Sequence, residues 1–338
     1  MEVINLILSL LLHPSIFVPL IFPGLITILI VIILLIWAER KIAAKIQMRI
    51  GPLYVTRRFG GVLQLLADLL RYMFAELIIS KESDKFMFIA SPIIALTVTL
   101  LPLAVIPAGS LLGIELVALR TSIGLLAALT LSSLTPIFII VMGWASNNKF
   151  ALIGSLREGY LMISYEVPMY LSALSVAILH GSLDIINVVN NQQKIWTALI
   201  NPFAAFSFFT SMIMSTSRFP FEITESDSEL VAGPYTEYSS ILYGLVMGVP
   251  YMRLYVFTLL FVDLFLGGWY PAIDGFSSII LISKVLIILL FSVFLRSVYP
   301  RYRLDQAIRI GWHSLFVLSL ISIILSLLII GFGGIGGC

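Results

Sequence analysis

The densest group of ionisable side chains in this chain lies between residues 217 and 239, which read SRFPFEITESDSELVAGPYTEYS. Five acids fall within 16 residues there, although the chain is 60% apolar and only 11% charged. They are Glu222, Glu225, Asp227, Glu229 and Glu237. Carboxylates at such density beside a bilayer are costly unless they face water, a partner or a polar cavity. The cluster therefore predicts a docking surface or a polar cavity.

A sixth carboxyl, Glu166, lies inside an apolar run that predicts a membrane helix over 160–181. An ionisable residue within a span is a proton-relay candidate by default. The alternative is a side chain that reaches back to the interface or to a cation. Glu158 precedes the run, and we expect it to be a surface acid.

Two cations, Arg253 and Lys284, also fall within predicted helices. Lone cations in a bilayer are expensive, and they mark functional sites unless they reach the interface. Asp263 and Asp274 lie toward the ends of these helices and are expected to draw both side chains outward. We therefore assign neither cation a role in chemistry.

Other site chemistries have little support. The single cysteine, Cys338, is the last residue, and His13, His180 and His313 are far apart. This pattern argues against a metal or iron–sulfur site, which needs several such ligands close together. The sequence predicts no redox cofactor bound by this chain.

The elements that must position the acids are membrane helices. A span needs about 20 mostly apolar residues. Eight runs qualify, and with an interfacial amphipathic helix over 60–78 they predict an all-α polytopic membrane protein of one domain. The eight runs are 15–38, 86–108, 122–144, 160–181, 198–216, 238–261, 276–295 and 310–331.

The basic residues predict the orientation. Sixteen of the 20 Lys and Arg residues fall in segments on one side, and only Arg120 and Lys194 fall in loops on the other. Cytoplasmic loops carry such an excess. Both termini are then expected outside and the acidic stretch inside. The inside loops are 39–85, 145–159, 217–237 and 296–309.

Several motifs, in this order, resemble the protein of respiratory complex I that joins the membrane arm to the peripheral arm, called the H subunit in bacteria and subunit one in mitochondria. The most specific is RFPFEITESDSELVAG followed by EYS (218–239). The others are AERKIAAKIQMRIGP (38–52), GVLQLLADLLR (61–71), ASNNKFALIGSLREG (145–159), ISYE (163–166), LFLGGW (264–269) and RSVYPRYRLDQ (296–306).

This resemblance implies a function in a proton-pumping NADH-quinone oxidoreductase. The family's subunit forms much of the chamber in which quinone, the substrate, is reduced by electrons from the terminal iron–sulfur cluster of a peripheral-arm subunit. Small membrane subunits and antiporter-like subunits are the other expected partners. The resemblance also implies the cell membrane of a prokaryote, with the inside loops in the cytoplasm.

By position, the resemblance also implies roles for individual residues. The quinone-cavity and docking residues are Arg40, Gln47, Arg49, Asp68, Arg218, Arg296 and Arg301. The proton-path residues are Glu166, Glu222, Glu225, Asp227 and Glu229.

The chain departs from the family pattern at two membrane-level acids. These positions are Ser215 and Pro250 here, so Glu166 and the loop acids are expected to carry more of the path. Two alternatives to the quinone-site subunit are open. One is the equivalent subunit of an energy-converting membrane-bound hydrogenase or a ferredoxin-linked complex. The other is a stand-alone transporter or channel, which would need polar residues through several spans or paired broken helices.

Overall fold

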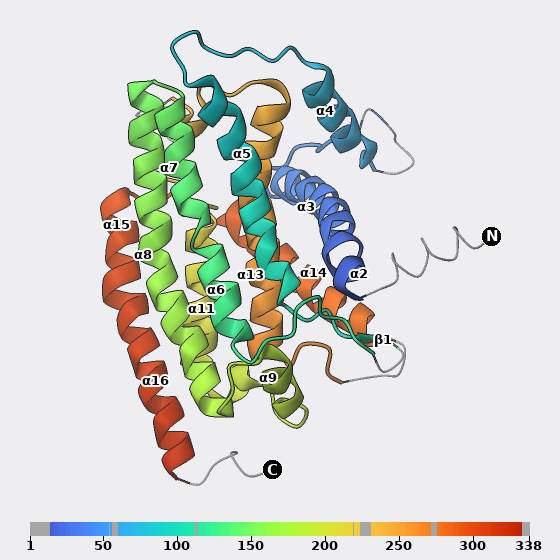
Figure 1. The fold of residues 1–338 in the computed structure, drawn as a ribbon, viewed down its shortest axis with the longest axis vertical. Helices are drawn as coiled ribbons and strands as arrows, with labels where there is room; N and C mark the ends of the chain where they lie inside the picture. Colours follow the sequence, from blue (N-terminus) through green and yellow to red (C-terminus); the bar gives the residue numbers. More distant parts are fainter. Residues whose placement is uncertain are drawn as a thin grey trace, which may run out of the picture.

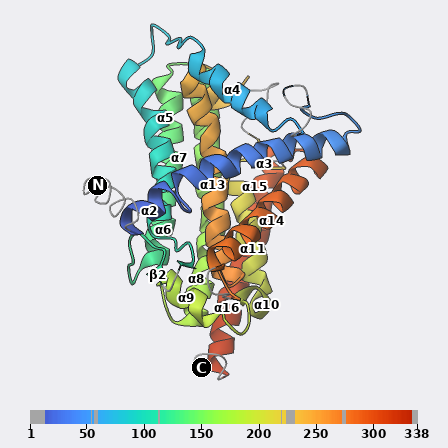
Figure 2. The same cartoon turned by 90° about the vertical axis from the view of Figure 1, so that its right-hand side faces the viewer.

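Long apolar runs of this chain form helices, because a backbone in lipid must satisfy its hydrogen bonds within its own segment. The computed structural model describes residues 14–53, 55, 60–111, 114–218, 220–223, 231–271 and 276–332. Figures 1 and 2 show a helical bundle, as the sequence predicts. Among these residues the strands are one antiparallel pair, β1 (Ser110–Leu111) and β2 (Ile114–Glu115).

The α-helices of the described residues are α2 (Pro14–Leu20), α3 (Leu25–Ile46), α4 (Leu63–Phe74), α5 (Lys85–Leu100), α6 (Gly124–Ser132), α7 (Thr135–Ala145), α8 (Lys149–His180), α9 (Ile185–Asn191), α10 (Thr197–Ile200), α11 (Pro202–Ser215), α13 (Ser240–Phe265), α14 (Ser277–Val298), α15 (Leu304–Arg309) and α16 (Phe316–Gly331). Single turns of other helix types are Leu101–Ala104 and Gly233–Tyr235, which are 3₁₀, and Ile310–Leu315, which is a π-helix.

Within the described residues, seven helical stretches are long and apolar enough to cross a bilayer. The remaining predicted span, the fifth at 198–216, is broken into α10 (Thr197–Ile200) and α11 (Pro202–Ser215). Pro202 begins α11, and the Asn201 side chain caps it by accepting a hydrogen bond from Ala204 N at 3.2 Å. At 1.5 Å per residue, α11 is about 21 Å long, shorter than the roughly 30 Å hydrocarbon core. The predicted count of eight full-length spans is therefore not confirmed.

Helix α8 begins well before the predicted residue 160. Asn148 accepts a hydrogen bond from Phe150 N at 3.0 Å and so starts the helix at Lys149. Most of segment 145–159, predicted as a loop, is therefore helical. The prediction was wrong because polar residues in this segment lower its hydropathy without preventing a helix whose polar groups find partners.

Helix α13 lies at the centre of the bundle and is buried along most of its length. It packs against α4, α5, α11 and α14. Helix α3 crosses the other helices at a steep tilt in Figure 2 and ends near α4. Helix α4 confirms the helix predicted over 60–78, although it is shorter, and it is mostly exposed.

Figure 1 shows which elements share an end of the bundle. Helix α4 and the first turns of α8 and α13 lie at the top, and the C-terminal end of α16 lies at the bottom. Three of the segments predicted to be inside are therefore near one another. Which end faces the cytoplasm stays a prediction.

Candidate functional site

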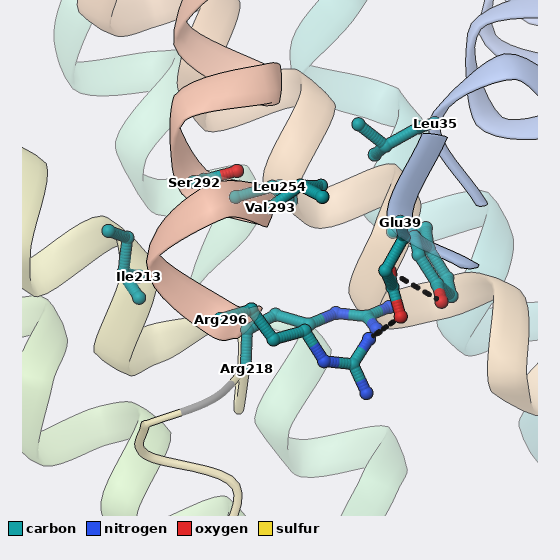
Figure 3. Close-up of a pocket in the computed structure, with 9 residues that line it drawn as sticks. Leu35, Glu39, Ile213, Arg218, Leu254, Ser292, Val293 and Arg296 are labelled. Atoms are coloured by element: carbon teal, nitrogen blue, oxygen red, sulfur yellow. Dashed lines mark hydrogen bonds and ion pairs between the residues drawn. The ribbon is translucent and has the colours of Figure 1, made fainter. Parts of the chain in front are cut away.

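A cluster of charged side chains lies where α3, α13 and α14 meet the segment that follows α11 (Figure 3). Arg296, on α14, forms an ion pair with Glu39 near the end of α3. The second guanidinium nitrogen of Arg296 lies 3.6 Å from Oε2 of Glu222. The Tyr251 hydroxyl, on α13, donates a hydrogen bond to Glu39 Oε2 at 3.2 Å. One arginine thus joins two carboxylates from segments far apart in the sequence.

Arg218 completes the cluster. Its guanidinium carbon lies 3.3 Å from the ring centroid of Tyr251, a cation–π contact. A small crevice opens between these polar groups and the apolar side chains of α3, α11, α13 and α14, with room for about one water molecule. Its lining residues are Leu35, Glu39, Ile213, Arg218, Tyr251, Leu254, Ser292, Val293 and Arg296.

The start of the acidic stretch is held in place by residues that follow α14. The ring of Phe221 stacks on Tyr302 with 5.3 Å between centroids. Tyr302 N donates to Pro220 O at 3.0 Å. Phe221 N donates to Arg218 O at 2.7 Å, which closes a turn. These contacts place Glu222 against α14, where it is 7% exposed.

The predicted docking residues fall into separate groups. Arg218 and Arg296 line the crevice. Arg40 pairs with Asp68 at 2.7 Å, which ties α3 to α4. The two remaining groups are exposed: Arg49 Nε donates to Gln47 Oε1 at 2.7 Å, and Arg301 follows α14.

A second charged group lies inside the bundle. Glu166 forms an ion pair with Arg253, and the two side chains are 4% and 2% exposed. Nη1 of Arg253 also donates to Met162 Sδ at 3.1 Å, and the guanidinium lies 5.2 Å from the Phe257 ring centroid. The prediction that Arg253 is drawn outward was wrong, because a carboxylate on the neighbouring helix satisfies it within the bundle.

Glu158 was predicted to be a surface acid, but it is 0% exposed. Tyr235, in the 3₁₀ turn Gly233–Tyr235, donates a hydrogen bond to Glu158 Oε1 at 3.3 Å. This turn packs closely on α8: a Cβ atom built on Gly154 would lie 2.7 Å from Gly233 Cα. The prediction failed because the turn that covers Glu158 lies far along the chain.

Lys284 does reach the end of α13, in line with the prediction. Its Nζ donates to the carbonyl oxygens of Leu266, Gly268 and Tyr270 at 2.7, 2.9 and 2.5 Å. Asp263 is close enough for a Coulombic interaction with it. The Asp263 carboxylate is 0% exposed, and neither oxygen has a hydrogen-bond partner among the described residues.

Some predicted residues lie outside the described part of the chain. These are Asp274 and three of the path acids, Glu225, Asp227 and Glu229. Within the described part, no group of three or more His, Cys, Asp or Glu side chains could hold a metal ion.

Three residues of these groups were not singled out as site residues from the sequence. Glu39 lies within the motif AERK, where its position beside Arg40 was the available signal. Tyr251 follows Pro250, a position noted only for its missing acid. Arg253 could have been paired with Glu166 by asking which intramembrane carboxylate offsets an intramembrane cation.

Comparison with known proteins gives a consistent result. The family model described as NADH dehydrogenase matches residues 20–327. The H subunit of NADH-quinone oxidoreductase from Geobacillus thermodenitrificans is 37% identical over 297 residues, which are 87% of this chain and 88% of that protein. The H subunits from Magnetococcus marinus and Syntrophotalea carbinolica are both 37% identical, over 84% and 89% of this chain and 82% and 92% of their own lengths.

Proposed function

The chain belongs to the NADH dehydrogenase family, with the H subunits of NADH-quinone oxidoreductases, and from this premise we propose that it shapes a quinone chamber and begins a proton path. Its helices fit a multi-pass protein of a prokaryotic membrane. The relatives are subunits of an enzyme complex, so the reaction belongs to the assembly rather than to this chain alone.

The observation that carries the proposal is the shared arginine, Arg296. It holds Glu39 at the end of a membrane helix and lies beside Glu222, the first acid of the dense stretch. Apolar side chains and charged groups meet at this crevice. Quinone reduction takes up two electrons and two protons, so a chamber wall at which apolar side chains meet linked charges suits it. A change at the quinone would reach the acids through Arg296.

The proton path of the proposal leads from the acidic stretch to Glu166. Tyr165, next to Glu166, packs in one apolar cluster with Ile223, which directly follows Glu222. Glu222 and Glu166 thereby belong to neighbouring parts of the bundle. Glu225, Asp227 and Glu229 extend the acid series on the same stretch.

The partners of the proposal are the subunits of a complex I-type assembly. Peripheral-arm subunits supply the terminal iron–sulfur cluster, and small membrane subunits and antiporter-like subunits continue the proton path. The loops rich in Lys and Arg face the cytoplasm and receive the peripheral arm. This chain contributes the chamber wall and charged groups, and no redox centre of its own.

The test measures quinone reduction by the whole complex in membranes. In Arg296→Gln, Glu39 and Glu222 lose their shared cation, and we expect quinone-dependent turnover to fall at least about tenfold, as for loss of one charged partner. Transfer of electrons to an artificial acceptor at the peripheral arm should be unchanged. Arg303→Gln, at an exposed arginine of the same segment, is the matched control and should keep turnover.

Photolabelling gives an independent test of the site. A quinone analogue carrying a photoreactive group should label residues between Gln47 and Asp68 and between 218 and 230. Labels confined to segments 109–121, 182–197 and 262–275 would refute the proposed chamber. So would normal quinone turnover in Arg296→Gln.

The hydrogenase-type alternative shares this charged architecture but delivers electrons without quinone. The relatives described above are all quinone oxidoreductase subunits, which favours the first function. The subunit composition of the purified complex separates the two. A nickel-binding large subunit would support the alternative, and bound quinone without that subunit would support our proposal.

A further inference from the structure

Glu166 and Arg253 meet deep inside two spans that begin at the same end of the bundle (Figure 1). At 1.5 Å per residue, Glu166 lies about 26 Å along α8 and Arg253 about 20 Å along α13. The two residues therefore pair well inside the bundle, away from the end at which α8 and α13 begin. Ionisable residues at such depth in a membrane protein usually pair with each other and mark ion or proton pathways.

Besides each other, Glu166 and Arg253 have few polar neighbours among the described residues. Arg253 also contacts Met162 and the ring of Phe257, and neither carries a charge. The Tyr170 hydroxyl also interacts with Glu166. That hydroxyl donates to Leu129 O at 2.9 Å. Among the described residues, Arg253 forms no ion pair other than the one with Glu166.

The two partners differ in how they can respond to a proton. A guanidinium keeps its charge in proteins, whereas a carboxylate can become a neutral acid. Protonation of Glu166 would break the ion pair and leave a charged arginine without its counter-charge, which is strongly unfavourable in a buried site. Glu166 can therefore accept a proton, but its protonated state is unfavourable because Arg253 stays charged beside it.

We propose that Arg253 is the positioning residue for Glu166 and makes it a transient proton carrier. The guanidinium holds the carboxylate ionised and oriented between α8 and α13. A proton from the acidic stretch converts Glu166 to the acid and releases it from Arg253. The proton then leaves to a water molecule or carboxylate of the membrane subunits that continue the path, Glu166 is again a carboxylate, and the ion pair with Arg253 re-forms. Arg253 gains and loses no proton. This inference rests on the proposed function, since it takes Glu166 to be on the proton path.

The test compares four variants of the whole complex in membranes: Arg253→Lys, Arg253→Met, Glu166→Gln and the double variant Glu166→Gln with Arg253→Met. Three quantities are measured in each. These are the amount of assembled complex, the number of protons translocated per electron, and the infrared carbonyl band that a protonated carboxyl has and a carboxylate lacks.

We expect Arg253→Lys to pump at least about half as well as the native complex, because a cation remains opposite the carboxylate. Arg253→Met should assemble and reduce quinone, but its carboxyl should take up a proton to remain neutral. It should therefore gain the carbonyl band and lose at least about half of its proton translocation. The band should be absent from the double variant.

Glu166→Gln should assemble at least about tenfold less, because a lone buried cation remains. The double variant should regain assembly and quinone reduction without regaining pumping. Native pumping in Arg253→Met, with pumping lost in the double variant, would overturn the inference and leave Glu166 on the path. Native pumping in the double variant would instead refute the proposed function of Glu166.

Discussion

Replacement of Lys284 by methionine should destabilise the end of α13 more than any change at a neighbouring position of α14. The lysine ammonium donates to three carbonyl oxygens, those of Leu266, Gly268 and Tyr270. It also lies near the buried carboxylate of Asp263. Methionine retains the apolar stem but supplies no donor and no charge.

The magnitude follows from these contacts. Hydrogen bonds from a charged group contribute about 1.5–3 kcal/mol each, and the low end applies because the ammonium is half-buried. Three such bonds together contribute roughly 4–5 kcal/mol of stability. Water that hydrogen-bonds to the freed carbonyl oxygens offsets part of this loss in the variant. We expect a net loss of about 3 kcal/mol, comparable to removal of one partner of a buried ion pair. For a large protein this corresponds to a fall of roughly 6–12 °C in the temperature of half-inactivation.

The assay is residual quinone-reductase activity of the complex after heating, with assembly checked by native electrophoresis. The matched control is Ser283→Ala, at the preceding exposed residue of α14, whose hydroxyl donates a hydrogen bond to Ile280 O within the same helix. A surface change of this kind should shift stability by less than about 0.5 kcal/mol. Adding Asp263→Asn to Lys284→Met should recover part of the loss. If Lys284→Met inactivates at the same temperature as Ser283→Ala, the three carbonyl contacts contribute nothing measurable and the reasoning fails.

Three further predictions concern the charged groups. Glu225→Gln or Glu229→Gln should impair turnover coupled to proton pumping while electron entry stays intact; normal coupled turnover in both variants would contradict a path through this stretch. Tyr251→Phe removes one hydrogen bond to a carboxylate and should lower quinone turnover about threefold to tenfold, measured against inhibitor-sensitive rates, because such a bond contributes about 1 kcal/mol. Arg40→Gln breaks an ion pair with Asp68 whose side chains are 46% and 30% exposed, so the thermal stability of the complex should change by less than about 1 kcal/mol.

The sequence was informative wherever hydropathy alone decides the structure. Seven of the eight predicted spans correspond to long apolar helices of the described chain, because backbone hydrogen bonding in lipid permits little else. The fifth predicted span, 198–216, failed at Asn201–Pro202. Its signal was present: proline favours the first turn of a helix, and asparagine favours the cap before it.

The candidate site was harder to predict, because its contacts join residues far apart in the sequence. Arg253 and Glu166 are separated by 87 residues, and the sequence around either residue does not indicate that the other is its partner. The same holds for Glu158 and the turn that covers it. Motifs did identify Arg296, Arg218 and the acidic stretch, since specific residue strings carried the resemblance. They could not show that one arginine would lie beside both Glu39 and Glu222.

The break before α11 has a consequence for how α16 docks against the bundle. The Asn201 amide nitrogen donates to Ser322 O at 2.8 Å and to Ser326 Oγ at 3.0 Å, both on α16. Helix α16 belongs to the least buried of the seven spans of the described residues and follows the other six along the sequence. Until it docks, the amide donors at Asn201 lack these partners in a low-dielectric setting, which is unfavourable. Docking of α16 therefore satisfies the Asn201 amide, and these two hydrogen bonds fix which face of α16 turns toward α11.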